Sequence, residues 1–151
     1  MTYVREGRPE EAAALTALAL RSKAHWGYDG AFMAACRDEL TVRPAEVTAR
    51  RTAVAEGDGG LLGFTMLDGS PPEGALGMMF VEPDAMGRGV GRLLFAHTAA
   101  LARRLGFVRL TIDADPHAES FYTAMGAARI GATPSGSVPG RELPLLALAL
   151  A

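Results

Sequence analysis

Residues 80–94 of this chain read Phe-Val-Glu-Pro-Asp-Ala-Met-Gly-Arg-Gly-Val-Gly-Arg-Leu-Leu. An apolar run stops at Pro83, and Gly87, Gly89 and Gly91 then open an amphipathic helix. Because glycine has no Cβ, such a loop can turn sharply and point several backbone N–H groups at one ligand, beside the positive end of the helix dipole. The stretch therefore predicts a binding site for a phosphorylated ligand.

Two well-known phosphate loops do not fit this spacing. The dinucleotide-binding pattern requires a third glycine where Arg92 stands, and the P-loop requires Gly-Lys-Ser/Thr, which the chain lacks. The stretch instead resembles motif A of the GCN5-related N-acetyltransferases, in which a strand ending Val-x-Pro leads through Arg/Gln-x-x-Gly-x-Gly/Ala into a helix. Residues 86–91, Met-Gly-Arg-Gly-Val-Gly, match the loop, with Met86 where that family usually has Arg or Gln. In the family, this loop binds the pyrophosphate of acetyl-CoA.

A second motif lies downstream, over residues 110–127. Its alternating β-branched start predicts a strand, Asp115 is a good helix N-cap before Pro116, and Gly126 ends the short helix that follows. The segment resembles the family's next motif, Asn-x-x-Ala-x-x-Phe/Leu-Tyr-x-x-x-Gly-Phe. The residues in register with it are Asp115, Ala118, Phe121, Tyr122 and Gly126. Asp115 replaces the usual Asn, and Ala127 replaces the usual Phe.

Length and composition agree with this resemblance. The chain has 151 residues and is 49% hydrophobic, which suits one compact domain and is too short for two ordinary ones. The resemblance implies an α/β (α+β) fold over residues 1–151. It consists of a mixed, mostly antiparallel sheet with a splayed pair of parallel strands, flanked by helices.

Sequence periodicity and turn signals predict the individual elements. Strands are expected at 3–5, 52–55, 61–67, 76–81, 108–114 and 143–151, the last as a buried strand. One helix is expected to begin at residues 8–11. Further helices are expected over residues 31–40, over residues 89–105 and in the segment between 115 and 126. The crossover through 89–105 makes the strands at 76–81 and 108–114 parallel neighbours.

The resemblance also implies the residues that hold acetyl-CoA as a co-substrate. In the family, the pantetheine arm lies against the first of the splayed strands, and a tyrosine lies near the thioester sulfur. These roles transfer to a set of cofactor-binding residues, Phe80, Val81, Arg88, Gly89, Val90, Gly91, Arg92 and Asp115. Tyr122 is the catalytic candidate, as a hydrogen-bond donor to the sulfur that becomes negative; a tyrosine packed in the core is the alternative.

The general base and the acceptor pocket are less constrained by sequence. Many relatives carry a glutamate on the strand before the glycine loop, but residues 76–81 contain no acid or histidine. The remaining candidates for the base are Glu73, Glu82, His25, Asp29 and His117, or water alone. Substrate binding is predicted for the aromatic and acidic segment that contains His25, Trp26, Tyr28 and Asp29, as a pocket for an ammonium group. The alternative is that its aromatic rings only close the core.

Charge and composition disfavour several other classes of site and partner. The formal net charge of -2 gives no basic excess for nucleic-acid binding. The single cysteine, Cys36, cannot form an internal disulfide, and the three histidines have no close metal-ligand spacing, so no metal is expected. The first residues lack the layout of a signal peptide and the apolar tail is shorter than the roughly 20 residues of a membrane span, so a cytoplasmic protein without membrane contact is expected. A homodimer is left open.

Three classes of function follow from these residues. The first is an acetyl-CoA-dependent N-acetyltransferase acting on a primary amine of a small molecule or a peptide N-terminus. The second is a non-catalytic domain that binds or senses acyl-CoA, favoured by the missing acid in residues 76–81 and disfavoured by Tyr122. The third is a nucleotide-binding protein of another fold, disfavoured by the failed fingerprints.

Overall fold

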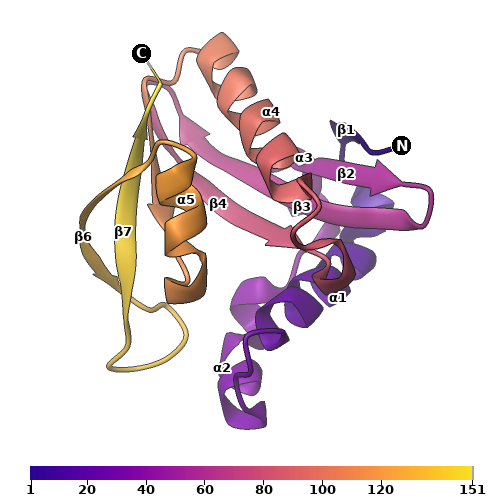
Figure 1. Ribbon diagram of the computed structural model, residues 1–151, viewed down its shortest axis with the longest axis vertical. Coiled ribbons are helices and arrows are strands. Elements are labelled where there is room, and N and C mark those ends of the chain that lie inside the picture. Colours follow the sequence, from indigo (N-terminus) through magenta and orange to yellow (C-terminus); the bar gives the residue numbers. More distant parts are fainter. Residues whose placement is uncertain (151) are drawn as a thin grey trace.

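The computed structural model describes residues 1–150 as helices and strands arranged around one continuous sheet (Figure 1). The strands are β1 (Tyr3–Glu6), β2 (Ala53–Gly57), β3 (Gly60–Ser70), β4 (Glu73–Val81), β5 (Arg109–Asp113), β6 (Ala128–Pro134) and β7 (Glu142–Ala149). The helices are α1 (Ala12–Ala24), α2 (Gly30–Leu40), α3 (Pro44–Ala49), α4 (Val90–Leu105) and α5 (Glu119–Ala124). Short 3-10 turns at Pro9–Glu11, Pro83–Ala85 and Pro116–Ala118 precede α1, the glycine loop and α5.

Within the described residues, the sheet has the strand order β1-β2-β3-β4-β5-β7-β6. All neighbours are antiparallel except β4 and β5, which are parallel. The chain leaves β4, passes through α4 and returns as β5, and a crossover of this kind is what parallel strands require. The predicted mixed sheet with one parallel pair is confirmed.

Two groups of helices cover the two faces of the sheet. The core on one face joins α1, α2 and α3 to β2, β3 and β4, with Leu15, Leu18 and Phe64 fully buried. The core on the other face joins α4 and α5 to the sheet, with Leu94 and Leu146 fully buried. In Figure 1, α4 and α5 lie in front of the sheet and α1 lies behind it.

The parallel pair separates soon after it forms. β4 and β5 pair only where Glu73–Ala75 faces Arg109–Thr111. Beyond Ala75, β4 continues to Val81 paired with β3 alone, and its register with β3 shifts by one residue at Gly77. The edge of β4 over residues 76–81 therefore carries backbone groups that β5 does not satisfy, which a protein interior seldom leaves unmet.

The expected elements are present with small shifts at their ends. α4 begins one residue later than predicted, with Gly89 as its N-cap and Gly106 as its C-cap, both in the left-handed region. β7 is a strand as expected, but its residues alternate between buried and more exposed positions. Ala151, the last residue of that predicted strand, lies outside the described residues.

Two elements have no counterpart in the sequence-based prediction. α3 has only 6 residues, and β6 exposes nearly every side chain, so neither shows the periodic apolar pattern that identifies a helix or a strand. β6 becomes a strand because β7 offers it a backbone to pair with. Among residues 1–150, no helix is long and apolar enough to cross a membrane.

Candidate active site

A cavity of about 780 Å³ runs along the separated edge of β4. It is lined by the glycine loop at one end, by β4, β5 and α5 in the middle, and by α1, α2 and the β6–β7 connection at the other end. The gap between β4 and β5 is what allows one cavity to reach helices on both faces of the sheet. This volume lies within the range of about 300–1,000 Å³ that is typical of small-molecule and cofactor sites.

The glycine loop has the geometry of an anion-binding site. Gly87 and Gly89 have φ angles of 78° and 83°, a region that residues with a side chain rarely adopt, and nothing lies within 4 Å of a Cβ built on either. Gly89 is the N-cap of α4, a helix of 16 residues, whose first backbone N–H groups have no partner within the helix. Gly87 and Gly89 both line the cavity.

The side chains around this loop divide into two groups. Gly91 and Arg92 also line the cavity, and a Cβ on Gly91 would lie 3.3 Å from the Phe121 ring, so glycine permits α4 and α5 to approach. Arg88 is exposed and reaches only the carbonyl of Asp84, at 3.5 Å. The Val90 side chain is buried in the core under α4, which leaves only its backbone for a ligand.

Phe80 and Val81 form the wall of the cavity at the free end of β4. The Phe80 ring packs against Phe64, with centroids 5.9 Å apart, so its side chain is part of the core. The backbone of the same residues lies on the edge that β5 does not pair. Packing by the side chain and hydrogen bonding by the backbone are thus compatible at these positions.

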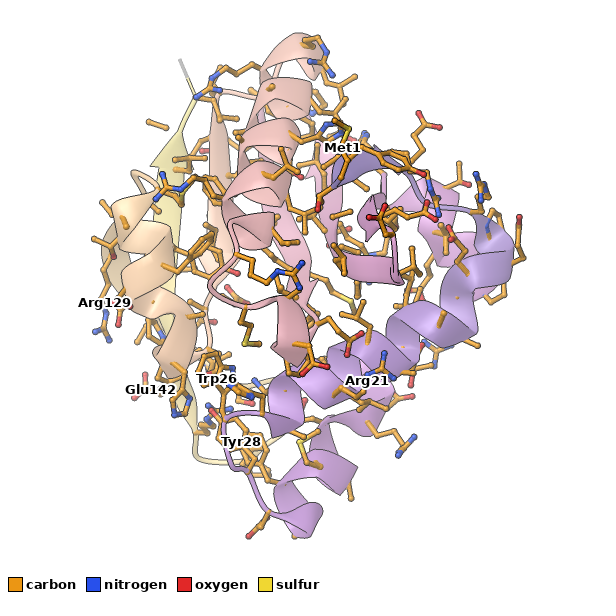
Figure 2. All side chains as sticks on the ribbon, turned by 45° about the vertical axis from the view of Figure 1, so that its right-hand side comes forward. Met1, Arg21, Trp26, Tyr28, Arg129 and Glu142 are labelled. Carbon is orange, nitrogen blue, oxygen red and sulfur yellow. The ribbon has the colours of Figure 1, made fainter. Side chains whose placement is uncertain are left out.

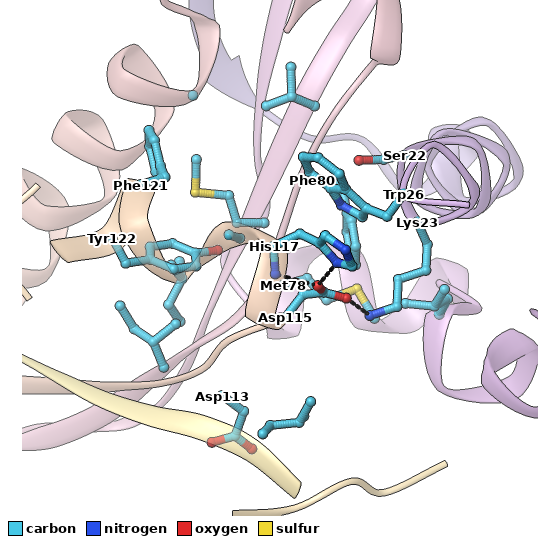
Figure 3. A pocket seen from close by; sticks show the side chains of 18 of the residues that line it. Ser22, Lys23, Trp26, Met78, Phe80, Asp113, Asp115, His117, Phe121 and Tyr122 are labelled. Atoms are coloured by element: carbon cyan, nitrogen blue, oxygen red, sulfur yellow. Dashed lines mark hydrogen bonds and ion pairs between the residues drawn. The ribbon is translucent and has the colours of Figure 1, made fainter. Parts of the chain in front are cut away.

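Tyr122 lies on α5 in the middle of the cavity, and only 7% of its surface is exposed. Its ring packs against Phe121 and Phe95, and its hydroxyl makes no hydrogen bond to any residue in the described range. Figure 3 shows the hydroxyl directed into the cavity. Burial, and secondarily the negative charge of Asp115, raises the pKa of the Tyr122 hydroxyl well above its usual range. The group therefore remains protonated and can donate a hydrogen bond.

Asp115 organises the opposite end of the cavity (Figure 3). Its Oδ2 accepts from Lys23 Nζ at 2.6 Å and from the Tyr28 hydroxyl at 2.8 Å. Its Oδ1 lies 2.9 Å from both the backbone N and the Nδ1 of His117. Burial raises the pKa of Asp115, but the hydrogen bonds from Lys23 and the His117 backbone outweigh it and hold the pKa well below its usual range. The carboxylate is thus charged, and protein groups already occupy both of its oxygens.

Tyr28 connects this carboxylate to a second cation. Its hydroxyl accepts a hydrogen bond from Arg141 at 2.8 Å while it donates to Asp115. Its ring stacks on Phe32 with centroids 3.9 Å apart. Burial, followed by the hydrogen bond to Asp115, raises the pKa of Tyr28 to about 12, so its hydroxyl stays protonated.

The four residues predicted to bind the substrate have different roles in the structure. Trp26 lines the cavity, with its ring stacked on His117 at a centroid distance of 5.1 Å (Figure 3). Tyr28 lies outside the cavity lining and donates its hydroxyl hydrogen bond to Asp115. His25 ends α1 outside the cavity lining, and the Asp29 side chain caps α2 by accepting from the Phe32 backbone. An anionic pocket built on Asp29 is therefore not what the fold forms, because a local helix cap takes that carboxylate.

The candidates for the base are likewise divided. Glu82 is held by two hydrogen bonds from Arg21, and Glu73 pairs with Arg109 at 3.2 Å; neither lines the cavity. Of the five candidates, only His117 lines it.

Sequence reasoning missed two cationic residues of the site. Lys23 precedes the aromatic segment, and Arg141 follows the turn at Pro139-Gly140; both line the cavity. No local pattern distinguishes them from surface cations, because their partner Asp115 is remote in the sequence. Within residues 1–150, no group of three or more His, Cys, Asp or Glu side chains is arranged to hold a metal ion.

A family model described as an acetyltransferase (GNAT) domain matches residues 48–126, just over half of the chain. No curated protein sequence matches the chain significantly.

Several solved structures share the fold over nearly the whole chain. A GCN5-related N-acetyltransferase from Rhodopseudomonas palustris is 26% identical, with a TM-score of 0.82, over 99% of this chain and 96% of its own. The PaiA N-acetyltransferase of Thermoplasma acidophilum, solved with coenzyme A, is 14% identical, with a TM-score of 0.80, over 99% of each chain. YncA from Salmonella typhimurium, solved with its cofactor acetyl-CoA, is 22% identical, with a TM-score of 0.74, over 100% of this chain and 95% of its own.

The Asp115 network predicts a pH-dependent contribution to stability. We expect Asp115→Asn to lower the free energy of unfolding by about 2 kcal/mol at pH 7, since Lys23 loses its charged partner. Because the pKa of Asp115 is lower in the folded chain than its usual value of about 3.9, this contribution is fully present above about pH 4 and is lost as the pH falls through the folded pKa. Urea unfolding should be measured for the native chain and for Asp115→Asn from pH 8 to pH 3. The difference between their free energies of unfolding should stay constant down to about pH 4 and become smaller below it.

Asp58 offers a matched control for this measurement. It is 95% exposed and pairs only with the N-terminal amine, so Asp58→Asn should change stability by less than about 0.5 kcal/mol. An Asp115→Asn difference as large at pH 3 as at pH 7 would contradict the assigned charge state.

Proposed function

We propose that this chain, which belongs to the GNAT acetyltransferase family, transfers an acetyl group from acetyl-CoA to a primary amine of a small molecule or of a peptide N-terminus. The observation that carries the proposal is the single cavity that joins the glycine loop to the Asp115 network past Tyr122. An anion site, a buried proton donor and a second binding region are the parts that acyl transfer to an amine requires.

The residues at the glycine end fit a diphosphate. The backbone N–H groups at the start of α4 and the side chain of Arg92 supply hydrogen bonds and positive charge, while Gly87 and Gly89 leave open space beside the backbone. The unpaired edge of β4 at Phe80 and Val81 can hydrogen-bond the amides of a pantetheine arm, as an added strand would. When bound, acetyl-CoA supplies the activated acetyl thioester.

Tyr122 is proposed to stabilise the leaving thiolate. Its hydroxyl is protonated and has no hydrogen bond to a described residue, so its proton is available for an atom in the cavity. A hydrogen bond that strengthens as sulfur becomes negative stabilises the transition state more than the ground state.

His117 is proposed as the general base, with Asp115 as its positioning residue. A carboxylate only accepts hydrogen bonds, so the 2.9 Å contact with Asp115 Oδ1 places the proton of a neutral ring on Nδ1. The Tyr28 hydroxyl, 3.2 Å from Nδ1, already donates to Asp115 and does not compete for that nitrogen. Nε2 then has the free lone pair needed to remove a proton from the acceptor amine.

The sensing alternative is favoured by the absence of an acid from residues 76–81, but the proposed base, His117, lines the cavity from a different element. Its presence supports an enzyme over a binding domain.

Acetyl-CoA binding is the first test of the proposal. Isothermal titration calorimetry should detect binding, and Arg92→Ala should weaken it roughly tenfold because a charge-assisted contact to phosphate is lost. The loss should shrink as salt is added. Arg88→Ala is the matched control, since Arg88 lies outside the cavity lining and should change the Kd little. Equal losses in both variants would argue against the proposed phosphate site, and absence of binding by the native chain would remove the proposed function.

For Tyr122→Phe, we expect a folded protein that binds acetyl-CoA with nearly native affinity but has a kcat lower by about ten- to a hundredfold. The reason is that the lost hydroxyl acts mainly where sulfur gains charge. Steady-state kinetics with an amine identified by CoA release, together with calorimetry, separate the two quantities. Full turnover by the folded variant would leave Tyr122 a structural residue only.

The role of His117 predicts a change in pH dependence. His117→Asn should lower kcat/KM at neutral pH by about a hundredfold or more, and the defect should narrow as the pH rises, because a growing fraction of the amine is then already deprotonated. His97, on α4 and outside the cavity lining, provides the control variant His97→Asn, which should keep the native profile. A pH-independent defect in His117→Asn would point to packing against Trp26 in place of proton transfer.

A further inference from the structure

The end of the cavity beyond Tyr122 holds more positive than negative charge in its half-buried part. Lys23 and Arg141 are 13% and 19% exposed, and both lie within 4 Å of the same carboxylate, Asp115, which is 12% exposed. Asp115 is the carboxylate that lies within 4 Å of these two cations, so the three side chains together carry a net charge of +1. Burying a charge costs free energy unless the charge is paired. A ligand group with one negative charge would therefore be stabilised beside these three side chains.

The hydrogen-bond inventory gives the same result. The Arg141 guanidinium has five N–H donors, and within the described residues it donates only to the Tyr28 hydroxyl. Lys23 Nζ has three donors and uses one, on Asp115 Oδ2. Both side chains line the cavity, so the remaining donors have access to a ligand.

The two cations are also held in place. The Arg141 guanidinium lies 4.8 Å from the Phe32 centroid and 5.2 Å from the Tyr28 centroid, and Lys23 Nζ lies 5.9 Å and 5.3 Å from the same two rings. The stacked pair of Tyr28 and Phe32 thus carries both cations, and cation–π attraction fixes them without neutralising them. These ring faces are occupied by the protein's own cations, which argues against their use for a substrate ammonium.

An orphaned hydroxyl lies in the same part of the wall. Ser137, in the β6–β7 connection, lines the cavity, and its Oγ is buried without a hydrogen-bond partner among residues 1–150. Ser135, two residues earlier, already accepts from the backbone N of Ser137 and of Val138. A buried hydroxyl without a partner carries a desolvation cost that a ligand acceptor atom would offset.

We infer that the acceptor amine also carries a carboxylate, as an amino acid does, and that Arg141 and Lys23 bind this carboxylate while Ser137 donates to it. The inference rests on the proposed function, since it names the acceptor of that reaction. The net charge of +1 matches a singly charged carboxylate better than a phosphate dianion, and the planar guanidinium suits its two oxygens.

The other charged residues of the cavity do not cancel this preference. Arg50 is neutralised by two 2.8 Å hydrogen bonds to Asp68. Glu39 and Asp113 also line the cavity, and the Glu39 carboxylate lies beside Gly136, next to Ser137. Both side chains are exposed, so water and salt screen their repulsion of an anion more than they screen the charges of Lys23, Arg141 and Asp115.

The test uses acceptors that share one carbon skeleton. CoA release is measured for an amino acid, its carboxamide, the amine without the carboxylate, and an amine with a phosphate in the carboxylate position. The native chain should prefer the carboxylate by at least about tenfold in kcat/KM over each of the others. Equal or faster turnover of the neutral amine or the phosphate compound would overturn the inference and leave the acetyltransferase proposal intact.

Variants of Arg141 and Lys23 then test whether these side chains bind the substrate carboxylate. Arg141→Gln should raise the KM for the amino acid about tenfold or more, change the KM for acetyl-CoA little, and abolish the preference over the carboxamide. Lys23→Gln should act in the same direction and provides the test if Arg141→Gln does not fold. Arg129→Gln is the matched control, because Arg129 on β6 points outward, lies outside the cavity lining and contacts only Glu119 and its own strand (Figure 2).

The outcomes separate the two proposals. If the native chain binds acetyl-CoA and the folded variants Arg141→Gln and Lys23→Gln both keep the native preference for the carboxylate, only the assignment of this cluster is overturned. A chain that neither binds acetyl-CoA nor releases CoA with any acceptor would overturn the acetyltransferase proposal and the inference with it.

Discussion

Loss of pairing between β4 and β5 after Ala75 is the constraint on which the site depends. A parallel pair that continued to Val81 would satisfy the backbone of β4 and close the sheet between the glycine loop and α1. Because the strands part instead, the edge of β4 stays open and one cavity reaches both faces. The helices keep this gap from collapsing, since α4 and α5 pack on one face and α1 to α3 on the other.

The two ends of the cavity use different electrostatics. At the glycine end, partial charges of backbone amides and a helix dipole face the cavity, and Arg92 adds the positive charge of a side chain. At the other end, full charges on Lys23, Arg141 and Asp115 are half-buried and positioned by aromatic rings. Asp115 joins elements that are far apart in the chain, so it acts on both the shape of this end and its charge. Tyr122 lies between the two ends with its hydroxyl protonated.

Sequence periodicity located the elements that bury a regular apolar face and failed for those that do not. α4 and β7 have such a pattern, whereas the short α3 and the exposed β6 are stabilised by contacts made only after folding. The same distinction applies to the site. Tyr122 and the glycine loop lie in motifs with a fixed spacing. Asp29 is predicted to bind the substrate only because its segment is aromatic and acidic, and in the structure its carboxylate caps α2.

The glycine loop follows from the local sequence, because positive φ angles, a helix start and its free N–H groups are properties of adjacent residues. The order of strand, loop, helix and strand that makes β4 and β5 parallel also follows from the sequence. Which charges meet at the other end of the cavity depends instead on how the whole chain folds. Lys23 and Asp115 are 92 positions apart and Tyr28 and Arg141 are 113 apart, and residues at such separations are brought together by sheet order and helix packing, which no local pattern encodes.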